Sequence, residues 1–123
     1  MKKGIELILQ ERQEQIEKNG LAVGHDASYA DGQLKQAALF CYQQARIKLG
    51  RTPTETIQWP DGWIKHFEDK IRNKSAIEQL AVCGAFWLAE YDRTNDEQYK
   101  TKAHVIGVEI DHYIEVINEL NKE

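Results

Sequence analysis

The feature that most constrains this fold is the apolar stretch at residues 75–93. Residues 81–89 form an unbroken apolar run, apart from the weakly polar thiol of Cys83. Ser75 and Glu78 have the spacing of a capping box, in which each residue satisfies a backbone N–H group at a helix start. A helix that is apolar on nearly all sides is typical of the centre of a bundle, where neighbours cover it from several directions. The stretch is also too short, and too closely followed by charged residues, to span a bilayer.

Helical periodicity predicts the surroundings of this stretch as well. Four further helices are expected: residues 3–19, residues 31–49, a short segment after Asp61, and a long final helix opening near residue 94. No segment has the alternating pattern of a strand, and with 123 residues the chain can bury one core of its own. We therefore expect a single all-α domain, residues 1–123, built as a compact helical bundle of about five helices around residues 75–93.

Residues with strong positional preferences mark the starts of these helices. Asp31 is expected to cap the helix at residues 31–49, and Asp61 is expected to cap the short helix that follows it. Thr94 and Glu97 have the spacing of a second capping box, which would open the final helix.

The final helix has an apolar seam of its own. Its members recur at alternating spacings of four and three: Tyr99, Ala103, Ile106, Ile110, Tyr113, Ile117 and Leu120. A heptad seam of this kind is typical of a bundle helix or of an oligomer interface. We expect a homo-oligomer, most simply a two-fold homodimer, with this helix as its interface.

The charge of the chain limits its partners. There are 16 Lys and Arg residues against 20 Asp and Glu residues, which gives a net charge of −4. This acidic balance argues against a protein dedicated to duplex nucleic acid. The charge is uneven, because residues 46–74 hold seven cationic and four acidic residues, whereas residues 90–123 hold four and nine. A local cationic region therefore coexists with an acidic final helix.

Cysteine usage and the N-terminus bear on the compartment. Cys41 and Cys83 lie in apolar helical patterns without the spacing of metal ligands, which predicts buried, reduced thiols. Lys2 and Lys3 are not followed by a long apolar segment, so no secretion signal is expected. We expect a cytoplasmic protein with no membrane partner.

Polar residues interrupt two faces that are otherwise apolar. The helix at residues 3–19 has an apolar stripe of Ile5, Ile8, Leu9 and Ile16. Arg12 lies in the centre of that stripe, with Glu11 and Gln15 at its edge. Glu90 shares the side of Phe86 in the central helix. Two interpretations stay open. Arg12 and Glu90 form a buried pair that holds two helices in register, or Glu11, Arg12 and Gln15 line a polar pocket. We expect Arg12 and Glu90 to face each other, with Gln15 nearby.

Two irregular connections carry further candidates. Residues 20–31 form a long connection with His25 and Asp26 at its centre, which is either a binding loop or a surface turn. Trp59 and Trp63 straddle a Pro-Asp-Gly turn. These tryptophans either cover the core as a lid, which is the commoner use, or form the aromatic wall of a site.

The sequence supplies only half of the acidic residues that a metal-dependent hydrolase needs. Nucleotide pyrophosphohydrolases of the MazG-like, all-α kind require clustered carboxylates on two helices. Glu11 and Glu14 have the spacing of one such pair, but no later helix supplies the second. His104 and His112 are about 80° apart around a helix, which is more typical of solvated histidines than of zinc ligands. We therefore expect no metal and no cofactor.

Several short motifs stand in a familiar order. They are Glu11-Arg12-x-x-Gln15, His25-Asp26, Gly32-x-Leu34-x-x-Ala37-Ala38, Trp59-Pro60 and Ala89-Glu90-x-x-Arg93. This order resembles a family of small uncharacterised proteins carried by bacteriophages and prophages, and the resemblance covers roughly residues 11–93. It implies a phage or mobile-element context without an established activity. Where that family has acidic residues before the His-Asp pair and after Gly32, this chain has Gly24 and Gln33.

Together with this resemblance, the inward polar residues and the tryptophans favour a phage-type, non-catalytic protein that binds a small nucleotide-like molecule and sequesters a host signal. Aromatic rings would stack on the base, arginines would contact phosphate, and His25 and Asp26 would bind the sugar or base edge. The candidate ligand-binding residues are Glu11, Arg12, Gln15, His25, Asp26, Tyr29, Trp59, Trp63, Glu90 and Arg93. The alternatives are a MazG-like, Mg-dependent pyrophosphohydrolase and a protein-interaction or structural phage protein that works through its final helix.

Overall fold

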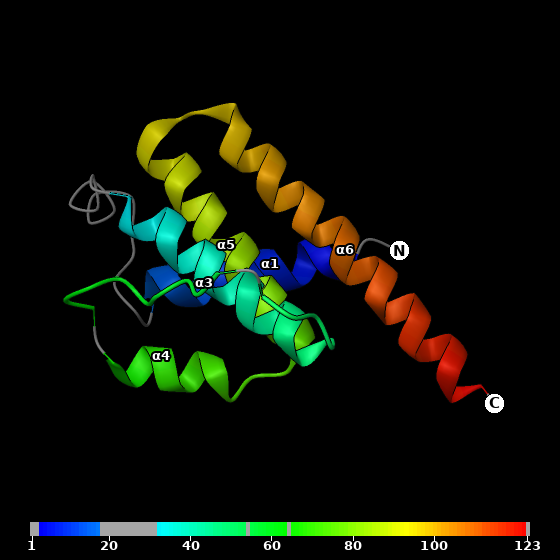
Figure 1. The fold of residues 1–123 in the computed structure, drawn as a ribbon. Helices are drawn as coiled ribbons and strands as arrows, with labels where there is room; N and C mark the ends of the chain where they lie inside the picture. Colours follow the sequence, from blue (N-terminus) through cyan, green and yellow to red (C-terminus); the bar gives the residue numbers. More distant parts are fainter. Residues whose placement is uncertain (1–2, 18–31, 54, 64, 123) are drawn as a thin grey trace.

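The computed structural model describes residues 3–17, 32–53, 55–63 and 65–122. This part of the chain contains five helices (Figure 1). They are α1 (Lys3–Glu17), α3 (Gln33–Lys48), α4 (Lys65–Arg72), α5 (Ala76–Thr94) and α6 (Glu97–Asn121). No strand occurs within these ranges. The prediction of a compact all-α bundle of about five helices is confirmed. None of the described helices is both long and apolar enough to cross a lipid bilayer.

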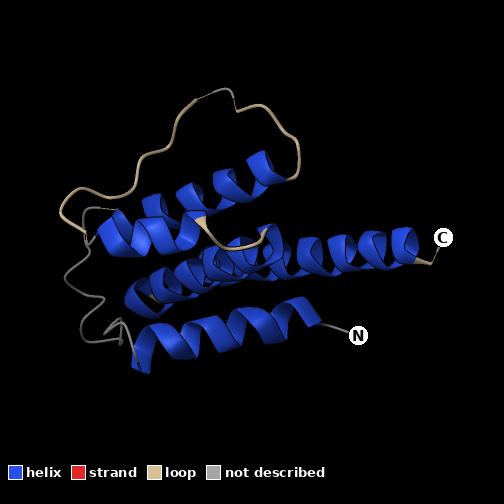
Figure 2. Cartoon of the chain, turned by 90° about the horizontal axis from the view of Figure 1, so that it is seen from below, coloured by secondary structure: helices blue, strands red, loops and turns tan. Residues whose placement is uncertain are grey.

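Helix α5 lies at the centre of the bundle. It packs against α3, α6 and α1, and α1 also packs against α6. Figure 2 shows α1, which starts at the N label, running along one side of the bundle beside the other helices. Every residue of α5 from Gln79 to Glu90 is buried except Leu88, which is half-buried. The central helix that the apolar stretch predicts is therefore confirmed.

The start of α5 is fixed by the predicted capping box. The Glu78 N–H group donates to Ser75 Oγ (3.2 Å), and the Ser75 N–H group donates to the Glu78 carboxylate (3.1 Å). Hydrogen bonding from the Ser75 backbone lowers the pKa of Glu78. The capping contribution to stability is therefore present above the pKa of Glu78 in the unfolded chain and is lost as the pH falls through the folded value.

The other predicted caps are wrong. Gly32, in the left-handed conformation (φ 85°), caps α3 in place of Asp31, which lies outside the described residues. Helix α4 begins at Lys65, so Asp61 does not cap it. Asp96 caps α6 by accepting a hydrogen bond from the Gln98 N–H group (3.1 Å).

The physical reason for the last difference is the end of α5. Thr94 is the final residue of α5, and its hydroxyl donates to the Glu90 carbonyl (2.9 Å). Asn95 then takes the left-handed conformation (φ 57°) and ends the helix. Only Asn95 and Asp96 connect α5 to α6. Thr94 therefore belongs to the last turn of α5 and does not cap α6.

Glycines allow α1 to approach its neighbours closely. A Cβ atom added to Gly4 would lie 2.1 Å from the Gly107 carbonyl oxygen of α6, and one added to Gly84 of α5 would lie 2.5 Å from Ile8 Cδ1. The Gly4 N–H group donates to Asp111 Oδ1 of α6 (2.7 Å). Helix α1 is thus held against both α5 and α6 by contacts that tolerate no extra side-chain atom at these positions.

The seam of α6 divides into two parts. Its first four members, from Tyr99 to Ile110, are buried against the bundle, whereas Ile117 and Leu120 are exposed. The last turns of α6 extend beyond the other helices (Figure 1). The first part of the heptad seam is therefore used inside one chain and is not available as an interface.

Both cysteines behave as predicted. Cys41 and Cys83 are buried free thiols, and burial raises the pKa of each thiol above its ordinary value. Neither forms a disulfide in this structure.

Candidate functional site

The predicted inward arginine lies between α1 and α5. Arg12 is 5 % exposed, and its Nε and Nη2 atoms donate to Asp92 Oδ2 at 3.1 and 2.9 Å. Its Nη1 atom donates to Gln15 Oε1 at 3.3 Å. The burial of Arg12 and the proximity of Gln15 are as predicted, but the carboxylate of α5 that accepts from Arg12 is Asp92 and not Glu90. Residues two apart on a helix point about 200° apart, so Glu90 turns away from α1.

Glu90 has cationic partners of its own. Its side chain is fully buried, and it accepts a hydrogen bond from Arg93 Nε at 2.6 Å. Lys35 Nζ of α3 lies 3.9 Å from the second carboxylate oxygen, and the same amine lies over the ring of Tyr99, 5.2 Å from its centroid. Glu90 therefore links the end of α5 to α3.

We call these charged and amide side chains the polar brace. Its members are Arg12, Gln15, Lys35, Glu90, Asp92 and Arg93. Three cationic side chains meet two carboxylates here, and each arginine already pairs with one of them. Burying charge is costly unless partners and hydrogen bonds compensate it. The arrangement suits a brace that fixes α1 and α3 against α5, which is the structural interpretation of Arg12.

The two predicted tryptophans meet beside the core. Trp59 is 8 % exposed and makes edge-on contacts with Phe40 (5.4 Å between ring centroids), Trp63 (5.3 Å) and Phe86 (6.2 Å). Trp63 is half-buried against the same cluster. Phe86 precedes Glu90 by one helical turn, so the aromatic cluster and the polar brace share a face of α5. The lid interpretation of Trp59 fits this burial.

A hollow opens over these rings, and we call it the tryptophan hollow. Its volume is about 360 Å³, and its lining comes from residues 56–63 together with Lys65, Glu68 and Arg72 of α4. Arg72 Nη2 pairs with Glu68 at 2.8 Å, and Lys65 Nζ lies 3.9 Å from Asp69. Trp59 Nε1 is buried and has no hydrogen-bond partner in the structure. An unsatisfied buried donor is rare, because it loses its water without gaining an acceptor.

Three of the predicted site residues, His25, Asp26 and Tyr29, lie outside the described residues. Glu11 is half-buried, and the charges that act on it include Lys74 and Glu78, beside the first turn of α5. The Glu11 carboxylate is therefore near the start of α5, whereas Arg12 pairs with Asp92 near the end of α5. Within the described ranges, no group of three or more His, Cys, Asp or Glu residues is placed to share a metal ion.

Glu11 gives a pH-dependent prediction. Burial raises its pKa, so the folded protein disfavours the ionised carboxylate. Its contribution to stability is complete below the unfolded pKa of about 4.3 and is lost as the pH rises through the folded value. We expect Glu11→Gln to raise the melting temperature at pH 7 and to have little effect at pH 4. Glu6→Gln, at an exposed position of α1, is the control, and an equal rise in both variants would contradict the assignment to burial.

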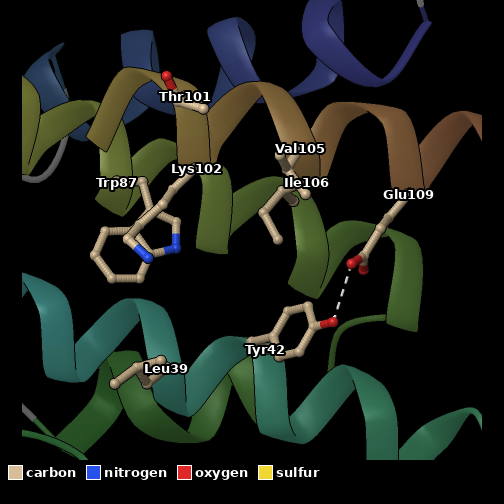
Figure 3. Close-up of a pocket in the computed structure, with 8 residues that line it drawn as sticks. All are labelled: Leu39, Tyr42, Trp87, Thr101, Lys102, Val105, Ile106 and Glu109. Atoms are coloured by element: carbon tan, nitrogen blue, oxygen red, sulfur yellow. Dashed lines mark hydrogen bonds between the residues drawn. The ribbon is translucent and has the colours of Figure 1, made fainter. Parts of the chain in front are cut away.

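A groove between α3 and α6 is a feature that the sequence did not reveal. Its volume is about 320 Å³, and Figure 3 shows its lining: Leu39, Tyr42, Trp87, Thr101, Lys102, Val105, Ile106 and Glu109. Lys102 Nζ lies over the Trp87 ring, 5.3 Å from its centroid, and Tyr42 Oη donates to Glu109 at 3.0 Å. The signal in the sequence was Val105, an apolar residue outside the heptad seam.

No family model, no curated protein sequence and no solved structure matches this chain.

Proposed function

We propose that this protein binds a small nucleotide-like molecule, without catalysis, in the tryptophan hollow. The observation that carries the proposal is the Trp59 Nε1–H group, which is buried without a hydrogen-bond acceptor in a residue that lines the hollow. A phosphate or base-carbonyl oxygen of a ligand would accept this hydrogen bond and remove the cost of leaving it unmade. Trp63, which is half-buried and also lines the hollow, supplies an aromatic ring for a base.

Size and charge support the same ligand. Binding pockets for small molecules have volumes of about 300–1,000 Å³, and the hollow measures about 360 Å³. Lys65 and Arg72 line the hollow beside Asp61 and Glu68, and both cationic side chains are exposed although they pair with Asp69 and Glu68. Arg12 and Arg93, the expected phosphate contacts, are not among the residues that line the hollow. We therefore assign the phosphate contacts to Lys65 and Arg72. With the phage-type motifs of the sequence, we propose sequestration of a host nucleotide as the biological role.

The test begins with the ligand. Native mass spectrometry of freshly purified protein shows whether a small molecule accompanies the chain. Thermal-shift screening of mono-, di- and cyclic nucleotides follows, with and without Mg²⁺. We expect at least one nucleotide to raise the melting temperature, because a ligand that binds only the folded state stabilises it. The shift should not require Mg²⁺, and the nucleotide should be recovered unchanged.

Three substitutions locate the site. Trp59→Phe keeps an aromatic ring but removes the N–H group, and we expect it to weaken binding roughly tenfold, the value of about one hydrogen bond. Lys65→Gln, on an exposed side chain, should weaken binding through loss of charge. Lys100→Gln is the matched control, because Lys100 lies on α6 over the Tyr91 ring and away from the hollow. Circular dichroism checks that each variant is folded.

Three results would overturn the proposal. Equal affinity in Trp59→Phe and the parent would place the site elsewhere. Mg-dependent release of pyrophosphate would favour the alternative of a nucleotide pyrophosphohydrolase. Failure of every nucleotide to shift the melting temperature would leave the protein-interaction alternative.

A further inference from the structure

Helix α6 carries a second apolar stripe on its outer side. Its members are Val105, Val108, Val116 and Leu120, whose exposed fractions are 50 %, 55 %, 42 % and 66 %. His112, also exposed, lies between them on the same face. At 100° per residue this stripe is centred about a third of a turn from the buried residues Tyr99 to Ile110. It is therefore a different surface from the buried part of the heptad seam, and it shares only Leu120 with the exposed end of that seam.

The stripe lies between two intramolecular contacts. Gly107 and Asp111 bind α1 on one side of α6, and Glu109 accepts a hydrogen bond from Tyr42 of α3 on the other. Beside it opens the α3–α6 groove, where Leu39 of α3 is 44 % exposed across from Lys102 (Figure 3). Apolar surface thus continues from α6 into the groove. Continuous exposed apolar surface of this kind marks interaction sites.

The charges along the stripe identify the occupant. Glu109, Glu115 and Glu119 follow the lysines at the start of the helix, so two copies of α6 aligned in parallel would bring like charges together. An antiparallel alignment instead places three residues of this surface level with complementary ones. Three pairs are symmetric about the point between residues 110 and 111: Lys102 with Glu119, Val105 with Val116, and Glu109 with His112.

We infer that the occupant is a second copy of this chain, with the two α6 helices antiparallel about a two-fold axis beside residues 110 and 111. An isologous interface requires this self-complementarity, in which each contact occurs twice. Antiparallel helix dipoles also favour the arrangement. Leu120 of the second copy then lies beside Lys102, at the opening of the groove that holds Leu39. This surface is separate from the tryptophan hollow, so dimerisation and nucleotide binding are tested independently.

Light scattering after size exclusion tests the oligomeric state. We expect a mass twice the 14.2 kDa of one chain at micromolar concentration. Val105→Glu and Val116→Glu should each weaken the dimer by more than roughly 100-fold, because each places two uncompensated charges in an apolar contact. Leu9→Glu is the matched control, since Leu9 is an equally exposed apolar residue on α1 (55 %). A monomeric parent, or a dimer that both glutamate variants leave intact, would overturn the inference.

Disulfide trapping tests the register. Residues 105 and 116 are separated by about 16 Å along a helix, so Val105→Cys protein and Val116→Cys protein should not cross-link with themselves. A mixture of the two should form the mixed disulfide under mild oxidation. The native thiols are buried and do not interfere. Self-cross-linking of Val105→Cys would show a parallel arrangement and would refute the antiparallel dimer.

Discussion

Replacing Glu90 by alanine is expected to lower the free energy of unfolding by roughly 3 kcal/mol, the cost of removing one partner from a buried ion pair. The Glu90 side chain is fully buried, and Arg93, its hydrogen-bonded partner at 2.6 Å, is only 18 % exposed. Without the carboxylate, Arg93 and Lys35 lose their compensating charge, and water reaches Arg93 poorly. Urea denaturation of the parent and the variant measures the difference.

Two further variants serve as controls for this result. Glu90→Gln keeps the shape of the side chain and still accepts from Arg93, so we expect a smaller loss that isolates the charge. Asp69→Ala removes a carboxylate from the exposed pair with Lys65, which is 79 % exposed, and should change stability by less than about 1 kcal/mol. If Glu90→Ala were as stable as Asp69→Ala, the burial of the polar brace in solution would be disproved.

Replacing Gly4 by alanine is expected to lower the free energy of unfolding by roughly 2–3 kcal/mol, the range for atoms forced into a filled contact. The added Cβ atom would lie 2.1 Å from the Gly107 carbonyl oxygen, and a backbone atom inside α6 has little freedom to move away. The first turn of α1 must then separate from α6 and lose its hydrogen bond to Asp111. Alanine has a higher helix propensity than glycine, by about 1 kcal/mol. The expected loss of stability already includes this opposing gain.

Gln10→Ala is the matched control on the same helix. Gln10 is exposed, and alanine there should leave stability within about 0.5 kcal/mol of the parent. Thermal unfolding followed by circular dichroism compares the three proteins. A Gly4→Ala protein as stable as the Gln10→Ala protein would mean that α1 does not cross α6 at the distance described.

The fold was predictable from sequence where periodicity and composition act on one helix at a time. The apolar run at residues 81–89 requires cover on several sides, and Ser75 with Glu78 fixes where that helix starts. Caps were less predictable, because two or three nearby residues compete for each end. Thr94 and Asp96 both suit a helix start, and the left-handed conformation of Asn95 decides between them.

The candidate site was predictable only in part, because periodicity identifies the inward side of a helix but not its neighbour. Arg12 and Glu90 both face inward as predicted, yet α5 presents Asp92 to α1 and Glu90 to α3. Trp59 and Trp63 meet because a single turn separates them in sequence. Lys65 and Arg72 join them only through the placement of α4. The sequence pattern of a helix or loop does not show which side chains of another element it will contact.

The docking of α1 has a consequence for synthesis of the chain. Helix α1 leaves the ribosome before α5 and α6, which carry its binding surfaces. The hydrogen bond from Gly4 to Asp111 spans 107 positions of sequence. A helix as short as α1 is only marginally stable alone in water. Ile8 and Arg12 therefore remain without their native partners until α5 has emerged, and α1 completes its contacts only after α6 has emerged.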